Sequence, residues 1–548
     1  MISQLSTASV ATTAALLVIV AILLQIIQRV FFHPLRSAPG PWANRISEIP
    51  ATIALVTGNQ HTYYRSLHEK YGPVVRVSPE ELSFVSVEAR EEIYGLRKGG
   101  LNMEKSAIFL GAVGSVEGQT GVSLALNAEH TRQRRALGYL FTNTALLQHE
   151  SLLRLHVNKL VTVLKQKAAE KQPIDVSSWY TYISFDVMGD LCFAEPFGCL
   201  DQASATEWST SVINVFIAAT WTQGIRRLCG VGTLLESLAT KLFVPAKAAQ
   251  WRNTHLNNSR EKTAKRLADG NRDHTDFIYQ ILKHNEAKNS LSDTEIKLNM
   301  ALFNSAGTDT TATTLTGWTY YICTHPQVYA RLVCEIRSVL RDAEDIKWEK
   351  VRNLPYLEAT IHESLRLFPP SGASQQRIVP RGGATIDGFY VPAGTTVAVS
   401  LPERWLGEGE KYANDRLGAS LPFGTGPRLG LSLAAKPLRS NNGNADQHGT
   451  GPGLILYYCQ QNLSLVFSTS TNLKEECDDN EAREEATQYV RLSPREYDIS
   501  GLALYIAAKG DCIEINSRNR NIELTIFVSL LTWLLTYLSG PLEKTKSS

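Results

Sequence analysis

Residues 292–326, SDTEIKLNMALFNSAGTDTTATTLTGWTYYICTHP, predict one long helix near the middle of the chain. Ser292 and Glu295 have the spacing of a capping box, which marks a helix start. Pro326 marks the end, because proline cannot continue a helix. The predicted helix spans residues 293–324, about 48 Å at 1.5 Å per residue, and is long enough to cross a whole domain.

The centre of this helix consists of poor helix formers, Ala306-Gly307-Thr308-Asp309-Thr310-Thr311. Ala306 and Gly307 lie four and three residues before Thr310 and share its face. A flat ligand could therefore approach the backbone beside a hydroxyl group, with the carboxyl group of Asp309 next to it. The alternative is that the Thr and Asp side chains face solvent and hydrogen-bond to the preceding turn.

The composition excludes several classes of protein. The 548 residues allow several domains or one large enzyme domain. Hydrophobic residues make up 43% and charged residues 20%, which excludes a disordered chain. The 55 Lys and Arg against 53 Asp and Glu leave a net charge of +2, too neutral for an electrostatic nucleic-acid binder. The eight cysteines contain no C-x-x-C pair, which argues against a zinc ribbon or a thioredoxin-like site.

The N-terminus predicts a membrane anchor over residues 1–28. This segment carries no charged side chain, and residues 14–24 are continuously apolar, while a helix needs about 20 residues to cross a bilayer. The alternative, a cleaved signal peptide, needs a positive charge before the apolar run, and the first is Arg29. Arg29 and Arg36 place the body of the protein in the cytosol by the positive-inside rule.

After the anchor, residues 29–45 predict a stiff hinge, because 33–42 read HPLRSAPGPW and prolines cannot extend the helix. Residues 46–435 then read as mostly helical without a repeat period. Short β signals occur at residues 74–77 and in a hairpin-like stretch at 386–394. The expected fold class is mainly α with a small β region.

Three further motifs follow the long helix: His362-Glu363-Ser364-Leu365-Arg366, Pro402-Glu403-Arg404-Trp405 and Phe423-Gly424-Thr425-Gly426-Pro427-Arg428. In the first motif Glu363 and Arg366 are three residues apart and share one helix face. The ordered set A-G-x-D-T-T, E-x-x-R, P-E-R-W and F-G-x-G-x-R resembles the cytochrome P-450 family of haem-thiolate monooxygenases. The resemblance covers roughly residues 10–434, and the HPL…PGPW hinge and the HTRQRR stretch at 130–135 are similar to membrane-bound fungal members.

This resemblance implies the cytochrome P-450 fold over residues 46–435, a large helical domain with a long central helix plus a small β-sheet subdomain. It implies haem (iron protoporphyrin IX) as cofactor, with electrons from NADPH through a separate NADPH-cytochrome P-450 reductase. The implied reaction is NADPH- and O2-dependent hydroxylation of a lipophilic small molecule in fungal secondary metabolism, for instance a terpenoid or polyketide. The implied location is the endoplasmic reticulum membrane, single-pass, with the enzyme on the cytosolic face. Substrate contacts are expected in variable loops around residues 101–122 and 203–244.

The resemblance also assigns roles to single residues. Asp309 and Thr310 would deliver protons during oxygen activation, since a hydroxyl donates and accepts while an acid recharges it. The haem propionates would be held by four cationic side chains, namely His130, Arg134, Arg377 and Arg428. Phe423 would also contact the cofactor. Glu363, Arg366 and Arg404 would form a buried structural network behind the haem.

The sequence departs from the family pattern at the haem ligand. The family has a cysteine two positions after the motif arginine, but here Arg428-Leu429 is followed by Gly430. The match resumes at Gly430-Leu431-Ser432-Leu433-Ala434, as if two residues were missing. Cys459 lies in a poor match to the motif and is not expected to replace the ligand, so no metal ligand is assigned. Without a thiolate, the electron push that favours O–O cleavage is lost.

Two other departures lie nearby. Between Thr395 and Pro402 the family has about twenty residues more, so the body is shortened near residues 396–401 as well as at 429–430. Residues 436–548 form an atypical C-terminal tail, whose apolar run at 524–538 predicts a core helix or a second membrane segment.

These departures suggest a mis-spliced or eroded gene. They leave open the alternative that the chain is a catalytically inactive relic, or a non-catalytic binding protein of the same family. A nucleotide-binding reductase is excluded, because Leu429 occupies the third glycine position of a G-x-G-x-x-G fingerprint.

Overall fold

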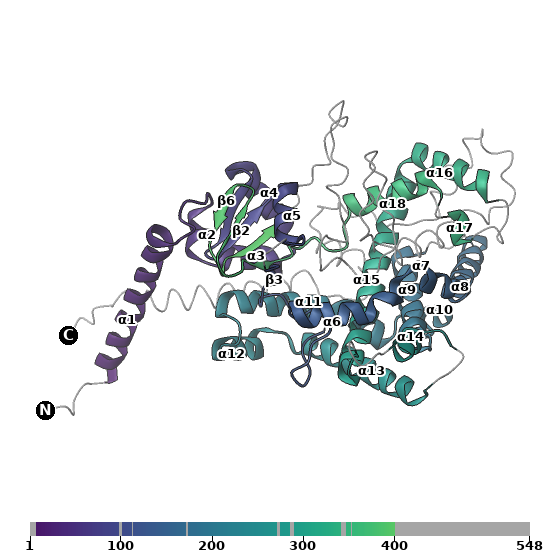
Figure 1. Cartoon of the computed structure of the whole chain (residues 1–548), viewed down its shortest axis with the longest axis horizontal. Coiled ribbons are helices and arrows are strands. Elements are labelled where there is room, and N and C mark those ends of the chain that lie inside the picture. The colour runs from purple at the N-terminus through teal and green to yellow at the C-terminus, as the bar shows by residue number, and fades with distance from the viewer. Residues whose placement is uncertain are drawn as a thin grey trace, which may run out of the picture.

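The structure is a computed structural model whose described residues are 7–97, 101–111, 113–170, 174–270, 274–284, 290–340, 347–351 and 353–400 (Figure 1). Helices account for most of the described elements, and the strands are two to five residues long. The predicted class, mainly α with a small β region, is therefore confirmed. The motifs at 402–405 and 423–428, the shortened regions and the tail from 436 lie outside the described residues.

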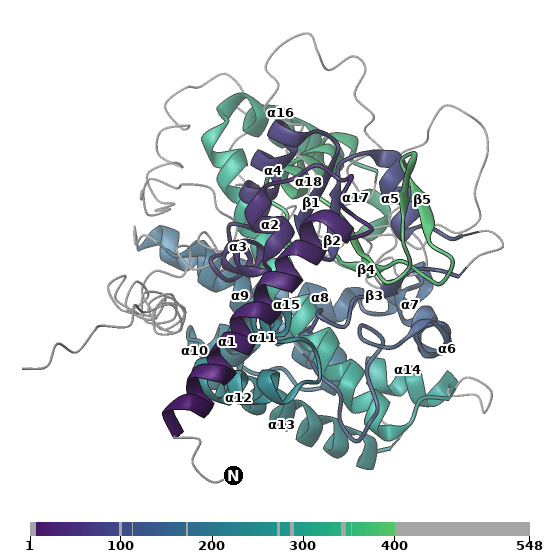
Figure 2. The same ribbon diagram turned by 90° about the vertical axis from the view of Figure 1, so that its left-hand side faces the viewer.

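The long helix predicted from residues 292–326 is confirmed as α15, Asp293–Thr324. The Ser292 hydroxyl group accepts a hydrogen bond from the backbone of Glu295, and the Glu295 carboxylate accepts one from the backbone of Ser292. This capping box fixes the start of the helix. α15 runs through the middle of the molecule and packs against α9, α11, α13, α16 and α18 (Figures 1 and 2).

The helices divide into those before and after β3, Glu104–Lys105. The early ones are α1 Thr7–Ile27, α2 Trp42–Ile46, α3 Ile49–Val56, α4 Gln60–Tyr71 and α5 Val87–Tyr94. The later ones begin with α6 Asn127–Leu137, α7 Asn143–Gln148, α8 Glu150–Ala169, α9 Val176–Phe193, α10 Cys199–Gln202, α11 Glu207–Cys229, α12 Leu234–Phe243, α13 Ala246–Ala268 and α14 Phe277–His284. After α15 come α16 Pro326–Val339, α17 Trp348–Val351 and α18 Pro355–Leu367. A π-helical turn, η1 Gln28–Phe32, and a 3-10 turn, η2 Gly138–Phe141, complete the set.

The strands form two small sheets. The larger has the order β1-β2-β7-β4-β3, in which β2 and β7 run parallel and the other neighbours run antiparallel. Its strands are β1 Val74–Ser78, β2 Glu81–Phe84, β3 Glu104–Lys105, β4 Arg377–Ile378 and β7 Thr396–Val399. The smaller is a hairpin of β5 Ala384–Ile386 and β6 Phe389–Val391. Both β signals in the sequence are confirmed, while β2, β3, β4 and β7 were not predicted.

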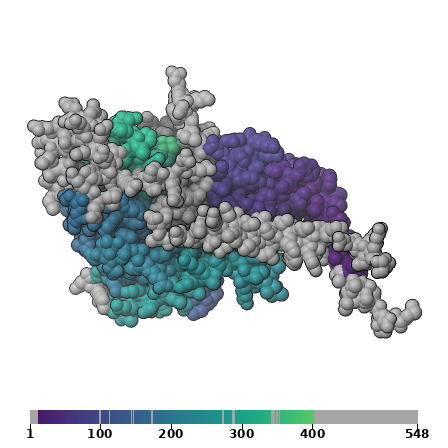
Figure 3. Space-filling view, turned by 180° about the vertical axis from the view of Figure 1, so that it is seen from behind, coloured from purple at the N-terminus to yellow at the C-terminus, as the bar shows by residue number. Residues whose placement is uncertain are grey.

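The strands and α2–α5 form a sheet module that lies beside the helical body of α6–α18 (Figures 1 and 3). The core of the sheet module contains Leu82, Phe84, Ile386 and Val397. The core of the helical body is one large apolar cluster around α8, α9, α15 and α18. α3 of the sheet module packs against α11 of the helical body.

α1 projects away from the body (Figure 1). Among the described residues, Ala15–Phe32 is one stretch that is long and apolar enough to cross a membrane, and it is largely exposed. The helix continues through η1 to Phe32, four residues beyond the predicted anchor. The following segment does not form a free spacer, because Leu35 and Ala38 are buried in the core of the sheet module and Pro39 accepts a backbone hydrogen bond from Arg76. The predicted hinge is thus packed against the sheet.

Candidate functional site

The centre of α15 presents a different environment on each face. Thr308, Asp309 and Thr311 are buried, while Ala306 and Thr310, which share another face, are only half-buried. Asp309 is 8% exposed, which excludes the alternative that this carboxyl group faces solvent. A half-buried face of small side chains on an otherwise buried central helix is compatible with a flat ligand lying against it.

The hydroxyl groups of this segment bond to the preceding turn. Thr310 Oγ1 donates to the Ala306 carbonyl at 2.7 Å, and Thr308 Oγ1 donates to the Asn304 carbonyl at 2.7 Å. The sequence left open that the threonine side chains hydrogen-bond to the preceding turn, and the structure shows these hydrogen bonds. The Thr310 oxygen keeps acceptor capacity in this arrangement, because a hydroxyl group has two lone pairs.

Gly307 has a structural role that the sequence did not indicate. A Cβ atom built on Gly307 would lie 2.4 Å from Sδ of Met188 on α9, so any side chain there would collide with that methionine. The glycine therefore allows α9 to pack closely against α15. In this arrangement the Met188 side chain occupies the space beside Gly307.

The structure brings α6, which carries His130 and Arg134, next to the strand that carries Arg377. Lys105 of β3 is the register partner of Arg377 in β4. The adjacent residue Glu104 accepts a hydrogen bond from the backbone of Asn127, the first residue of α6, at 2.9 Å. The start of α6 and the backbone of Arg377 are thus joined through β3.

Three of the predicted cationic side chains lie within the described residues, and they are buried to different degrees. His130 is 5% exposed and Arg377 is 4% exposed. Arg134 is half-buried, and burial lowers the pKa of its guanidinium group. The guanidinium carbon of Arg377 lies 5.0 Å from the centre of the Tyr94 ring, within cation–π range. Buried cations need anionic or hydrogen-bonding partners, which is the property that a carboxylate-bearing cofactor would use.

A polar junction that sequence reasoning missed fixes α6 against α15. Arg132 forms an ion pair with Glu295. The Gln133 amide donates to Glu295 at 3.0 Å, and the Asn299 amide donates to Gln133 at 3.1 Å. Asn299 also accepts a hydrogen bond from the backbone of Val122 at 2.9 Å. Only the capping role of Glu295 could be read from the sequence, because its other partners lie over 160 residues away.

The remaining predicted site residues stand as follows. Phe423, Arg428 and Arg404 lie outside the described residues. Arg366 pairs with Glu363 as predicted, but the Glu363 side chain is 53% exposed, so this part of the expected network is not buried.

Cys192 and Cys199 are buried, and burial raises the pKa of both thiols. Among the residues that the structure describes, no group of three or more His, Cys, Asp or Glu side chains is arranged to hold a metal ion.

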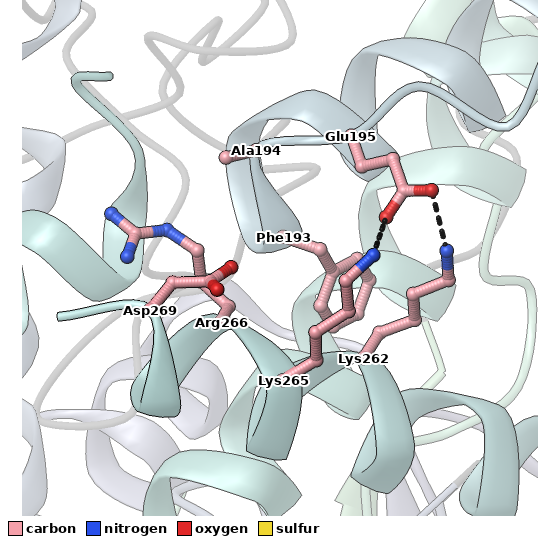
Figure 4. A pocket seen from close by; sticks show the side chains of 7 residues that line it. All are labelled: Phe193, Ala194, Glu195, Lys262, Lys265, Arg266 and Asp269. Atoms are coloured by element: carbon pink, nitrogen blue, oxygen red, sulfur yellow. Dashed lines mark hydrogen bonds and ion pairs between the residues drawn. The ribbon is translucent and has the colours of Figure 1, made fainter. Parts of the chain in front are cut away.

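A separate polar hollow lies between the end of α9 and α13 (Figure 4). Lys262 Nζ lies 2.8 Å from one carboxylate oxygen of Glu195, and Lys265 Nζ lies 3.5 Å from the other. These ion pairs join three of the charged side chains that line it, and Arg266 pairs with Asp276. It offers little apolar surface for a lipophilic substrate, so it is not the candidate site.

Comparison with known proteins agrees with this architecture. The cytochrome P450 family model matches residues 51–436. The chain is 60% identical over 447 residues to cytochrome P450 monooxygenase aba2 of Botryotinia fuckeliana. The aligned region covers 78% of this chain and 85% of the relative. It is 52% identical over 444 residues to cytochrome P450 monooxygenase ABA2 of Pyricularia oryzae, with 77% and 85% covered. It is 34% identical over 445 residues to a trichothecene C-15 hydroxylase of Fusarium sporotrichioides, with 76% and 86% covered. The long central helix with a half-buried face at its middle agrees with these matches, which lead to one conclusion: the chain belongs to the cytochrome P450 family, the haem-dependent monooxygenases.

Proposed function

We propose that this chain hydroxylates a lipophilic small molecule in fungal secondary metabolism, using haem, O2 and electrons from NADPH delivered by a separate reductase. The observation that carries this proposal is the half-buried face of α15 at Ala306 and Thr310, beside the buried carboxyl group of Asp309. The family membership supports the reaction class. The relative named trichothecene C-15 hydroxylase supports attack on a carbon atom of a terpenoid-like metabolite.

The described residues fit a haem group on their side of the site. The small side chains of α15 leave a partly exposed face, and His130, Arg134 and Arg377 supply cations that suit its two carboxylates. These three residues would hold the group, with Phe423 and Arg428 as further predicted contacts. The haem would supply oxygen activation when bound. The buried network of α6 with α15 would keep His130 and Arg134 in a fixed position relative to Thr310.

The proposed roles of Thr310 and Asp309 are proton delivery. The Thr310 hydroxyl is held toward the Ala306 carbonyl and can exchange this bond for one to a bound water or substrate. Asp309 would supply a new proton to the Thr310 hydroxyl group after Thr310 has passed its own proton on. Replacing Thr310 by Val keeps the shape and removes the hydroxyl, and we expect product formation to fall about 100-fold. Thr310→Ser should retain most of the activity, and equal losses in the two variants would contradict a proton-delivery role.

A second candidate function rests on the sequence around Arg428. No cysteine follows within the family spacing, and residues Gly430-Leu431-Ser432-Leu433-Ala434 resume the motif without it. This observation favours a protein that binds a lipophilic molecule without thiolate-driven oxidation. It equally favours an error in the transcript, which sequencing between Thr395 and Ser440 would reveal.

A carbon monoxide difference spectrum of the reduced, purified chain separates the two functions. A thiolate-type Soret band would support the monooxygenase. Bound haem without that band would support the non-catalytic binding protein. A protein that takes up no haem at all would contradict the proposed cofactor site.

The proposed location is the endoplasmic reticulum membrane, with the N-terminal helix as a single anchor and the catalytic body on the cytosolic face. Support comes from the apolar, largely exposed segment Ala15–Phe32, from Arg29 near the end of this segment and from Arg36 after it. We expect basic residues to dock an acidic reductase. Raised ionic strength should then slow electron transfer, and an unchanged rate would count against electrostatic docking.

A further inference from the structure

A continuous buried polar chain connects the predicted cofactor cation Arg377 to helix α11. It contains three side chains from distant parts of the sequence, Gln376, Glu81 and Arg227. The Gln376 amide donates to Oε2 of Glu81 at 2.8 Å, and Arg227 Nη2 donates to the same oxygen at 2.5 Å. Glu81 is therefore the branch point at which β2, α11 and the segment entering β4 meet.

The position of Gln376 links this chain directly to Arg377. The backbone carbonyl of Gln376 accepts hydrogen bonds from Arg377 Nη1 at 3.1 Å and from the backbone of Ser106 at 3.2 Å. Gln376 thus holds the Arg377 side chain through its carbonyl group, while its own side chain is fixed by Glu81. A shift of the Gln376 side chain would move the carbonyl that orients the arginine.

Tyr94 holds Arg377 from the other side. Its ring lies under the guanidinium group. Its hydroxyl group donates to the Gln375 carbonyl at 2.9 Å and accepts from the backbone of Val399 at 3.0 Å. Burial raises the pKa of Tyr94, and the negative charge of Glu81 acts in the same direction. The tyrosine therefore remains a neutral platform for the cation.

The burial of this chain shows that it is an integral part of the structure. Glu81 is 1% exposed, Gln376 is 6% exposed and Arg227 is 5% exposed. Burial alone would lower the pKa of Arg227, but the negative charges of Glu81 and Glu48 outweigh it and raise the pKa. Arg227 also donates to Glu48 at 3.0 Å, so its charge is shared between two carboxylates. Such groups are expensive to bury unless their geometry is maintained.

We propose that Gln376 and Glu81 are positioning residues that hold Arg377 ready for an acidic group of the cofactor, and that they tie this cation to helix α11 through Arg227. This inference rests on the proposed function, because it assumes that Arg377 binds a carboxylate of the haem. It assigns to Gln376 and Glu81 a role beyond the stability of the sheet module. Their removal should weaken recognition of the acid itself, in addition to any effect on folding.

The experiment compares two ligands that differ only at their acidic groups. Zinc protoporphyrin IX and its dimethyl ester are titrated into the full, haem-depleted chain, and binding is followed by porphyrin fluorescence. Neither ligand depends on the iron thiolate bond. The ratio of the two affinities measures recognition of the propionates, whereas a general loss of folding weakens both ligands alike.

Gln376→Met removes the amide donor but keeps a side chain of similar length. We expect it to lower the acid-to-ester affinity ratio about five- to tenfold, toward the value of Arg377→Gln, because charge-assisted recognition depends on orientation. Glu81→Gln keeps the shape and leaves Glu48 to pair with Arg227, and it should lower the ratio by a smaller factor. Gln280→Met is the matched control, since Gln280 is also 6% exposed and its amide donates to Gln148 at 2.8 Å rather than to the Glu81 network. It should leave the ratio unchanged.

Each outcome separates the positioning role from the proposed function. An unchanged ratio in Gln376→Met and Glu81→Gln, with a lowered ratio in Arg377→Gln, overturns the positioning role while the cofactor site stands. A native chain that does not prefer the acid over the ester overturns the cofactor site at Arg377 and, with it, the inference. A ratio that falls equally in the Gln280→Met control also overturns the positioning role, because the effect would then be general.

Discussion

The sheet module and the helical body differ in the balance of apolar and charged groups that they bury, although the helical body also buries the ion pair of Arg266 with Asp276. The helical body relies on an apolar cluster in which Leu153, Ile183 and Leu315 are fully buried. At its edge, the sheet module buries ionised and polar groups, among them Arg76 and Glu81, and receives Arg227 from α11. An apolar side chain can be shortened at the cost of a cavity, whereas a buried charge that loses its partner is left uncompensated. The boundary of the sheet module should therefore be the more sensitive region to single substitutions.

The largest effect is expected from Arg227→Met, which leaves the buried Glu81 and the half-buried Glu48 without their cation. We expect the free energy of unfolding to fall by about 3–5 kcal/mol. Urea-induced unfolding followed by fluorescence measures this change. Lys159→Met is the control, because Lys159 pairs with Asp201 at the surface, and it should cost about 1 kcal/mol or less. Similar losses in the two variants would mean that the buried cluster has no special sensitivity.

Leu315→Ala tests the apolar side of the comparison. Leu315 is fully buried where α15 meets the main apolar cluster. Truncation should lower the free energy of unfolding by about 3 kcal/mol through lost burial and a cavity. The same urea titration applies. If this loss exceeded that of Arg227→Met, the ranking of the two regions would be reversed.

The helical body should also be the acid-sensitive region through His255. Its Nδ1 accepts from Trp208 Nε1 at 3.2 Å and its Nε2 lies 3.0 Å from the Ala301 carbonyl, which is the pattern of a neutral ring. Burial lowers the pKa of His255 to about 4. Because the pKa is lower in the folded state than in the unfolded state, this stability is present above about pH 6.5 and is lost as the pH falls toward 4.

The loss from His255 should reach about 2 kcal/mol at pH 5 relative to pH 7. Urea unfolding at a series of pH values measures it. His255→Gln should be less stable at pH 7 and should show a flatter pH dependence between 6.5 and 5. A slope unchanged by the substitution would assign the acid sensitivity to other groups.

The smallest effect is expected at the contact between α9 and α15. Gly307→Ala places a Cβ atom against Met188 and should cost about 1–2 kcal/mol through overpacking. Met188→Ala in the same chain should recover part of this loss, because the two changes affect one contact. A double-mutant cycle of unfolding free energies measures the coupling. Additive losses would show that the glycine is needed for another reason.

The sequence predicted the central helix well because its signals are local. The capping box at Ser292 and Glu295 and the stop at Pro326 gave both ends of α15 correctly. The hairpin of β5 and β6 could be predicted equally well, because the Gly and Pro residues that indicate it lie within a few positions of the strands. Such features depend on neighbours in the chain and need no knowledge of the tertiary structure.

The rest of the sheet could not be predicted for the opposite reason. β2 reads ELSF, with a glutamate and a serine that are both buried, so it carries no alternation of apolar and polar residues. Its partners at the site, Arg227 and Gln376, lie 146 and 295 residues further along the chain. The hydrogen bonds of Asn299 and the contact of Met188 with Gly307 likewise arise only when distant helices pack.

The parallel pairing of β2 with β7 has a consequence for biosynthesis. Ser83 at one strand and Ser400 beyond the other are joined by a hydrogen bond although 317 residues separate them. At about 5–20 residues per second, a ribosome needs roughly 15–60 s to make the second strand after the first. During that interval the nascent β2 offers an unpaired edge that could join a neighbouring chain. Slower elongation or loss of a chaperone should therefore reduce the yield of this protein through aggregation of partly made chains.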